Sequence, residues 1–160
     1  MELGAIQEFI DGRHNELEGW FFSPDQLAFF ELCALQERSQ ISGDLCEVGV
    51  FKGKSLVLLS LLKRDTERLL GFDIFDEDHL EATQQSLSAF NAEKNVELYK
   101  GLTSDISLDM LDERIKNPLR FLHIDAGHEY HEVLEQLAIF TPYLADHAII
   151  AMDDYQDREF

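Results

Sequence analysis

Acidic residues follow two short apolar runs in the second half of the sequence, at the places where strands of a sheet would end. Asp125 ends the run 119–125, and Asp153 with Asp154 ends the run 148–153. Three carboxylates that converge at neighbouring strand ends repel one another unless a hard cation neutralises them, and oxygen ligands suit magnesium. These positions therefore predict a Mg²⁺ site. The alternative is that Asp125 and Asp153 only cap amides of the following segments while Asp154 is solvated.

Two glycines, Gly49 and Gly53, form a G-x-x-x-G turn between an apolar run and a helix-like stretch that starts at Ser55. Such a turn lets the backbone approach a ligand closely. A dinucleotide site would need a further glycine where Phe51 stands, so nicotinamide and flavin dinucleotides are disfavoured. The spacing also excludes a phosphate-binding P-loop. The alternative is a turn that serves only strand-to-helix packing.

Asp73 ends the next apolar run along the chain. A carboxylate at this position of an open α/β sheet can accept hydrogen bonds from the vicinal hydroxyls of a ribose, so Asp73 predicts nucleoside recognition. The alternative is a solvated carboxylate at the start of an acidic run that continues through Asp76, Glu77 and Asp78.

Short apolar runs alternate with helix-like stretches after residue 44, which is typical of a parallel sheet with crossover helices. The expected strands cover residues 44–50, 68–73, 96–101, 119–125 and 148–153, and the expected helices cover residues 55–62, 80–90, 108–115 and 129–140. A helix is also expected from Ser23, which precedes a proline, to Leu35. The predicted fold class is α/β: a doubly wound, mostly parallel sheet with helices on both faces.

The sequence stops at Phe160, seven residues past the fifth expected strand. Because open sheets of this kind usually continue further, we expect the fold to be truncated after strand five, with the C-terminal strands missing. The fifth strand would then be an exposed edge.

The 160 residues, of which 45% are apolar and 28% charged, suit one globular domain with its own core. A net charge of −19 disfavours nucleic acid and anionic membranes as partners and favours a neutral or cationic ligand. Cys33 and Cys46 lie in apolar stretches and are expected to be reduced core residues. Without a leader or a long apolar segment, the expected location is cytoplasmic.

The residues around the glycine turn resemble the S-adenosylmethionine site of class I methyltransferases, namely Glu47-Val48-Gly49, Gly53, Ser55 and then Asp73. Two later segments, 123–130 (HIDAGHEY) and 149–154 (IIAMDD), resemble the metal-dependent O-methyltransferases of the macrocin O-methyltransferase type. They are more distantly similar to the catechol type. The resemblance covers residues 45–154.

This resemblance implies a methyltransferase domain over residues 23–160, preceded by a lead-in over residues 1–22. It assigns S-adenosylmethionine to Glu47, Gly49, Gly53, Ser55, Asp73 and Asp125. It assigns Mg²⁺ to Asp125, Asp153 and Asp154, and the role of catalytic base to His128. Within the cofactor site, Glu47 would anchor the methionine end, Asp73 would bind the ribose, and the adenine would lie near residues 102–104.

The expected reaction is methyl transfer to a hydroxyl of a small molecule, with bound Mg²⁺ lowering the pKa of that hydroxyl and His128 accepting its proton. A homo-oligomer is a further option. Some residues depart from the family pattern, and these departures bear on the substrate class. Among them are Gln136, where an acidic residue is common, and the sequence 145–147 before the last strand.

Two other functions stay open. Asp125, His128 and His131 have the spacing of a two-histidine, one-carboxylate iron site, although this would leave the glycine turn and Asp73 unexplained. Alternatively, a catalytically incomplete module that binds S-adenosylmethionine or a nucleoside would act in assembly. Such a module would bind the cofactor without turnover, and another chain would pair with its exposed last strand.

Overall fold

The computed structural model describes residues 3–76, 78–102 and 106–153. Over these residues, five parallel strands form one sheet in the order β3-β2-β1-β4-β5. The strands are β1 (Asp44–Val48), β2 (Leu69–Asp73), β3 (Val96–Lys100), β4 (Leu119–Ile124) and β5 (Leu144–Met152). The chain order reverses direction between β1 and β4, so the carboxyl ends of these two strands flank the crevice where ligands bind in open α/β sheets.

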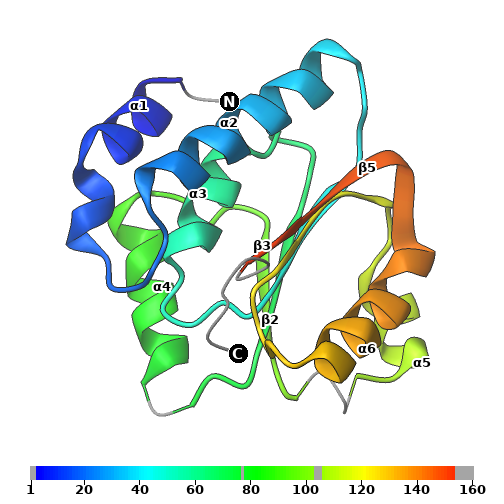
Figure 1. Cartoon of the computed structure of the whole chain (residues 1–160). Helices are drawn as coiled ribbons and strands as arrows, with labels where there is room; N and C mark the ends of the chain where they lie inside the picture. Colours follow the sequence, from blue (N-terminus) through cyan, green and yellow to red (C-terminus); the bar gives the residue numbers. More distant parts are fainter. Residues whose placement is uncertain (1–2, 77, 103–105, 154–160) are drawn as a thin grey trace.

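Helices cover both faces of the sheet (Figure 1). One face carries α1 (Leu3–Asp11), α2 (Ser23–Arg38), α3 (Lys54–Leu62) and α4 (His79–Ala89), and the other carries α5 (Leu108–Arg114) and α6 (Tyr130–Phe140). Short 3₁₀ turns lie at Arg13–Glu16 and Thr141–Tyr143.

Neighbouring residues of the central strands enter different halves of the core. In β1, Leu45 packs with α2 and α3, whereas Cys46 packs with α5 and α6, and Phe121 and Leu122 divide in the same way in β4. This division follows from the two-residue side-chain period of a strand. Because both faces are covered, β1 and β4 are buried along their whole length, charged residues included. Both predicted core cysteines are buried as free thiols.

Two elements differ from the sequence expectation. The expected strand 148–153 begins at Leu144 instead, because the segment 145–147 (ADH) forms an irregularity within β5, where His147 has a positive φ of 63°. The lead-in also contains α1, whose Ile6 and Phe9 are buried in the core beside α3. Ile6, Phe9 and Ile10 have the i, i+3, i+4 spacing of an amphipathic helix, a signal that the sequence reasoning missed.

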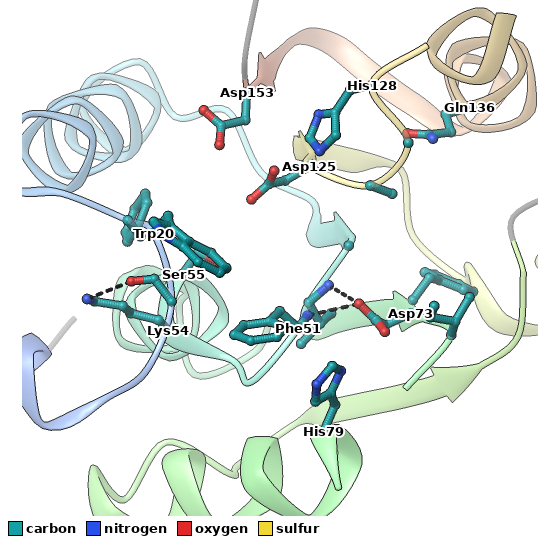
Figure 2. Close-up of a pocket in the computed structure, with 18 of the residues that line it drawn as sticks. Trp20, Phe51, Lys54, Ser55, Asp73, His79, Asp125, His128, Gln136 and Asp153 are labelled. Carbon is teal, nitrogen blue, oxygen red and sulfur yellow. Dashed lines mark hydrogen bonds between the residues drawn. The ribbon is translucent and has the colours of Figure 1, made fainter. Parts of the chain in front are cut away.

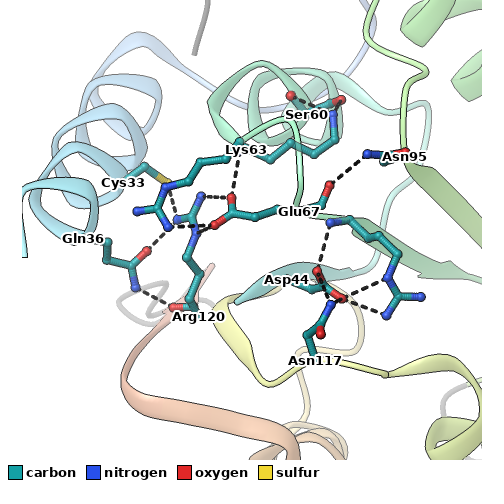
Figure 3. A network of polar contacts seen from close by, with 11 residues as sticks. Cys33, Gln36, Asp44, Ser60, Lys63, Glu67, Asn95, Asn117 and Arg120 are labelled. Carbon is teal, nitrogen blue, oxygen red and sulfur yellow. Dashed lines mark hydrogen bonds and ion pairs between the residues drawn. The ribbon is translucent and has the colours of Figure 1, made fainter. Parts of the chain in front are cut away.

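A buried ion pair holds β4 against the loop that precedes β2 (Figure 3). The Arg120 guanidinium is 1% exposed and donates to both oxygens of Glu67, at 2.9 and 2.8 Å, and to Oε1 of Gln36 at 2.7 Å. A bidentate pair with satisfied neighbours is the form in which charges tolerate burial. In the described part of the chain, no helix is long and apolar enough to cross a bilayer.

Candidate active site

A cleft of about 1050 Å³ opens above the carboxyl ends of β1, β2 and β4 (Figure 2). Six of the predicted site residues line it, namely Gly49, Ser55, Asp73, Asp125, His128 and Asp153. Gly53 lies behind the lining as the left-handed residue that precedes α3. Asp154 lies outside the described residues. The sheet therefore brings residues from four separate chain segments to one cavity.

The turn after β1 requires glycine at its first position. Gly49 has a φ of +91°, and a Cβ there would lie 2.0 Å from the backbone oxygen of Asp125. The backbone of the turn therefore runs directly against the end of β4. Gly53 has a φ of +85°, and a Cβ there would lie 3.0 Å from Cγ2 of Thr83 on α4, a second close approach. No larger residue fits the first position without moving the backbone.

The carboxylate of Asp73 holds this turn in place. Its Oδ2 accepts hydrogen bonds from the backbone N–H groups of Val50 (2.7 Å) and Phe51 (2.8 Å), and its Oδ1 accepts one from Phe75 (2.6 Å). A carboxylate has about four acceptor positions, so roughly one remains for a ligand. Asp73 thus has a positioning role that the sequence did not reveal, and its predicted contact with a ribose stays a prediction.

Two carboxylates, Asp125 and Asp153, meet at the ends of β4 and β5. Burial raises the pKa of Asp125 to about 7; His123 opposes this shift, while Asp153 and Glu47 add to it. Two carboxylates that repel each other in a partly dry site are a donor set that suits a hard cation such as Mg²⁺. Among the described residues, no group of three or more histidine, cysteine, aspartate or glutamate side chains is arranged to hold a metal ion.

Glu47 differs from its expected role at the methionine end of the cofactor. Its side chain is fully buried beneath the cleft rather than in the lining, and its Oε1 lies 2.7 Å from Nδ1 of His123 on the neighbouring strand. Burial lowers the pKa of His123, but the hydrogen bond and charge of Glu47 outweigh it and raise that pKa. The other carboxylate oxygen, Oε2, is buried without a hydrogen-bond partner in the described structure.

His128 and His131 lie on the far side of the cleft, at the start of α6. Both side chains are exposed, and the ring of His128 stands beside Asp125 (Figure 2). His128 is therefore placed near the carboxylate pair, as a proton acceptor for a bound hydroxyl would be. The alternative iron site of Asp125, His128 and His131 is not assembled as a metal-binding cluster in the residues that the structure describes.

The lead-in forms the opposite wall of the cleft, a role that sequence reasoning missed. Trp20 is 77% exposed, and its ring lies 5.7 Å from the ring of Phe51 in the glycine turn. The segment is fixed there by Lys54, which donates to the carbonyl of Gly19 at 3.1 Å, and by an ion pair between Lys52 and Glu18. The aromatic cluster at residues 20–22 was the available signal, because a large exposed aromatic group often marks a binding surface.

A family model described as a methyltransferase domain matches residues 46–155 of the chain. This span contains the glycine turn, Asp73, the carboxylate pair and His128. The chain belongs to this methyltransferase domain family. The predicted family and the predicted α/β fold class are thereby confirmed, whereas the macrocin subtype stays a prediction.

An uncharacterized protein of Acanthamoeba polyphaga mimivirus is 28% identical over 113 residues, which make up 69% of this chain and 51% of that protein. The match thus spans about half the length of this relative.

Solved structures with the same fold include a TDP-rhamnose 3'-O-methyltransferase of calicheamicin biosynthesis. Its sequence is 17% identical, and the TM-score is 0.69; the superposition covers 99% of this chain and 80% of that one. Another is the O-methyltransferase of Streptomyces achromogenes involved in tomaymycin synthesis, solved with S-adenosylmethionine, with 20% identity and a TM-score of 0.69 over 92% of this chain and 64% of that one.

Proposed function

We propose that the protein is an S-adenosylmethionine-dependent O-methyltransferase that acts on a hydroxyl of a small molecule with the help of Mg²⁺. The observation that carries this proposal is the shared cleft: the turn held by Asp73 and the carboxylate pair of Asp125 and Asp153 line one cavity. Family membership and the fold shared with known O-methyltransferases, one of them bound to S-adenosylmethionine, support it.

The two ends of the cleft would hold different reactants. The free acceptor position of Asp73 would take a ribose hydroxyl, and the close backbone of the turn at Gly49 would border the methionine part of the methyl donor. Asp125 and Asp153 would hold Mg²⁺ at the other end, together with Asp154. Bound Mg²⁺ would supply charge that lowers the pKa of the acceptor hydroxyl and fixes its orientation.

The chemical step needs mainly orientation. The hydroxyl oxygen attacks the methyl carbon of the sulfonium, so that an O–C bond forms as the S–C bond breaks and S-adenosylhomocysteine leaves. His128 accepts the hydroxyl proton, since its exposed ring stands at the cleft beside Asp125. Holding both reactants in line removes much of the entropic barrier, and no covalent enzyme intermediate is required.

Binding of S-adenosylhomocysteine, measured by calorimetry with and without MgCl₂, tests the cofactor site before any acceptor is known. Asp73→Asn is preferable to alanine, because it keeps one oxygen to hold the turn while removing the charge. Losing charge-assisted hydrogen bonds should cost about 1.5–3 kcal/mol, or roughly 10- to 150-fold in Kd. Asp76→Asn, at an exposed neighbouring carboxylate, is the matched control and should bind like the wild type.

Two results would contradict the cofactor site: a folded wild type that does not bind in either buffer, or equal binding by the Asp73→Asn and Asp76→Asn variants. Turnover is tested separately by mass spectrometry of hydroxylated acceptors incubated with S-adenosylmethionine. Activity that needs Mg²⁺ and is lost in Asp153→Asn is expected. Cofactor binding without turnover on any acceptor would instead favour the assembly module.

A further inference from the structure

Gln136 is a buried residue of the cleft lining whose side-chain oxygen is unsatisfied. It lies on α6, is 2% exposed, and belongs to the cleft lining. Its Oε1 is buried and has no hydrogen-bond partner in the described part of the protein. Buried amides in folded proteins are nearly always paired, so an unpartnered amide on a residue that lines a cavity indicates a group that arrives with a ligand.

This property separates Gln136 from the other buried polar atoms without partners. The described structure has two more, Oε1 of Gln26 and Oε2 of Glu47, and neither residue lines the cleft. The amide of Gln26 is also satisfied on its nitrogen side, which donates to the carbonyl of Phe21 at 2.9 Å. Gln136 alone among these three borders the space that a ligand would fill.

The packing of α6 sets this helix against β2, the strand that carries Asp73. One turn beyond Gln136 along the helix, the ring of Phe140 packs edge-on against Phe72 at 5.4 Å, and Phe72 immediately precedes Asp73. Because α6 begins at the carboxyl edge of the sheet, Gln136 lies closer to that edge than Phe140 does. Figure 2 shows its amide projecting from α6 into the upper part of the cleft. Leu102, which follows β3 and is 53% exposed, lines the same cavity.

We propose that Gln136 recognises the amino-bearing edge of the adenine of the methyl donor. A carboxamide can accept a hydrogen bond from the exocyclic amino group of adenine and donate one to N7 of the ring, whereas a keto purine presents two acceptors on that edge and offers no donor to the amide oxygen. The proposal rests on the proposed function and extends it, since it makes Gln136 the residue that sets the choice of base.

The test compares S-adenosylhomocysteine with S-inosylhomocysteine, in which a keto oxygen replaces the amino group, by calorimetry on the full chain. The wild type should prefer the adenine compound by roughly 5- to 150-fold. Gln136→Met, similar in length but without hydrogen-bonding groups, should bring the two affinities to within about threefold. Gln136→Glu keeps an acceptor oxygen for the amino group and should retain the preference. Gln84→Met, at an exposed position of α4 away from the cleft, is the matched control and should retain it too.

Thermal unfolding adds a readout that a packing role would not produce. Removing an unpaired buried amide should leave the melting temperature of ligand-free Gln136→Met equal to or above that of the wild type. If Gln136→Met does not fold, a structural role is shown and the proposal is overturned. Unchanged base preference in a folded Gln136→Met overturns it while leaving the proposed function intact. A wild type that binds neither compound overturns both.

Discussion

Replacement of Asp125 by asparagine should remove much of the pH dependence of folding stability. The pKa of Asp125 lies at about 7 in the folded protein, raised mainly by burial, whereas an unfolded aspartate titrates near 4. The folded state therefore binds this proton more tightly than the unfolded state. The resulting stability is fully present below about pH 4 and is lost as the pH rises through about 7.

The magnitude follows from the size of the shift. About three pKa units at roughly 1.4 kcal/mol each give an upper limit of about 4 kcal/mol. Solvent at the cleft screens the partly exposed carboxyl, so the observed loss should be smaller. His123 acts in the same direction at higher pH, because its pKa is also raised and its stabilising proton is lost as the pH rises. Part of the slope should therefore remain in Asp125→Asn.

Urea unfolding at a series of pH values between about 4 and 8 measures this difference directly. We expect the free energy of unfolding of the wild type to fall with pH and that of Asp125→Asn to fall less, so that the variant is the more stable at pH 8. Asp146→Asn, at an exposed position of β5, should follow the wild type. Added MgCl₂ should flatten the wild-type curve alone. Parallel curves for the wild type and Asp125→Asn would refute the raised pKa of Asp125.

Two further substitutions test the backbone of the site and the buried ion pair. Gly49→Ala places a Cβ 2.0 Å from the backbone oxygen of Asp125. It should therefore destabilise the fold by about 3 kcal/mol or more, measured by urea unfolding, and abolish S-adenosylhomocysteine binding, measured by calorimetry. Gly4→Ala, in open space on α1, is the control and should change neither. Arg120→Leu removes the bidentate partner of the buried Glu67 carboxylate, which keeps its ion pair with Arg64 at 3.0 Å. The substitution should therefore cost at most about 3–5 kcal/mol in the same unfolding assay. A loss below about 1 kcal/mol would show that Arg64 alone satisfies Glu67.

Much of the fold follows from local pattern. The short, mostly apolar runs around Leu45, Leu70 and Phe121 alternate with helix-like stretches, as in a sheet covered on both faces. Each strand is therefore predicted within two residues of its observed start and end, except the start of β5. That exception arises because the segment 145–147, with a positive φ at His147, lies inside β5 as an irregularity. Periodicity has no means of showing this.

The site was predictable to the extent that strand ends converge. Asp73, Asp125 and Asp153 were expected together because parallel strands deliver their carboxyl ends to one edge, and the structure places them there. The pairing of Glu47 with His123 was not predictable, because it joins side chains 76 residues apart through strand register. Local spacing reveals which edge a residue reaches, but not whether its side chain faces the cleft or a neighbour beneath it.

Two of the three buried side-chain atoms without a hydrogen-bond partner in the described structure lie in or beneath the cleft, and this clustering supports the proposed function. They are Oε1 of Gln136 and Oε2 of Glu47, whereas Oε1 of Gln26 lies on α2 outside the cleft lining. The carboxyl of Asp125, whose pKa is raised mainly by burial, lines the same cleft. Each raises the free energy of the ligand-free fold, and natural chains retain such costs mainly where a site requires them. A cation in the cleft would neutralise the carboxylate of Asp125, and a methyl donor would supply a hydrogen bond to the amide of Gln136. Binding of both should therefore raise the free energy of unfolding.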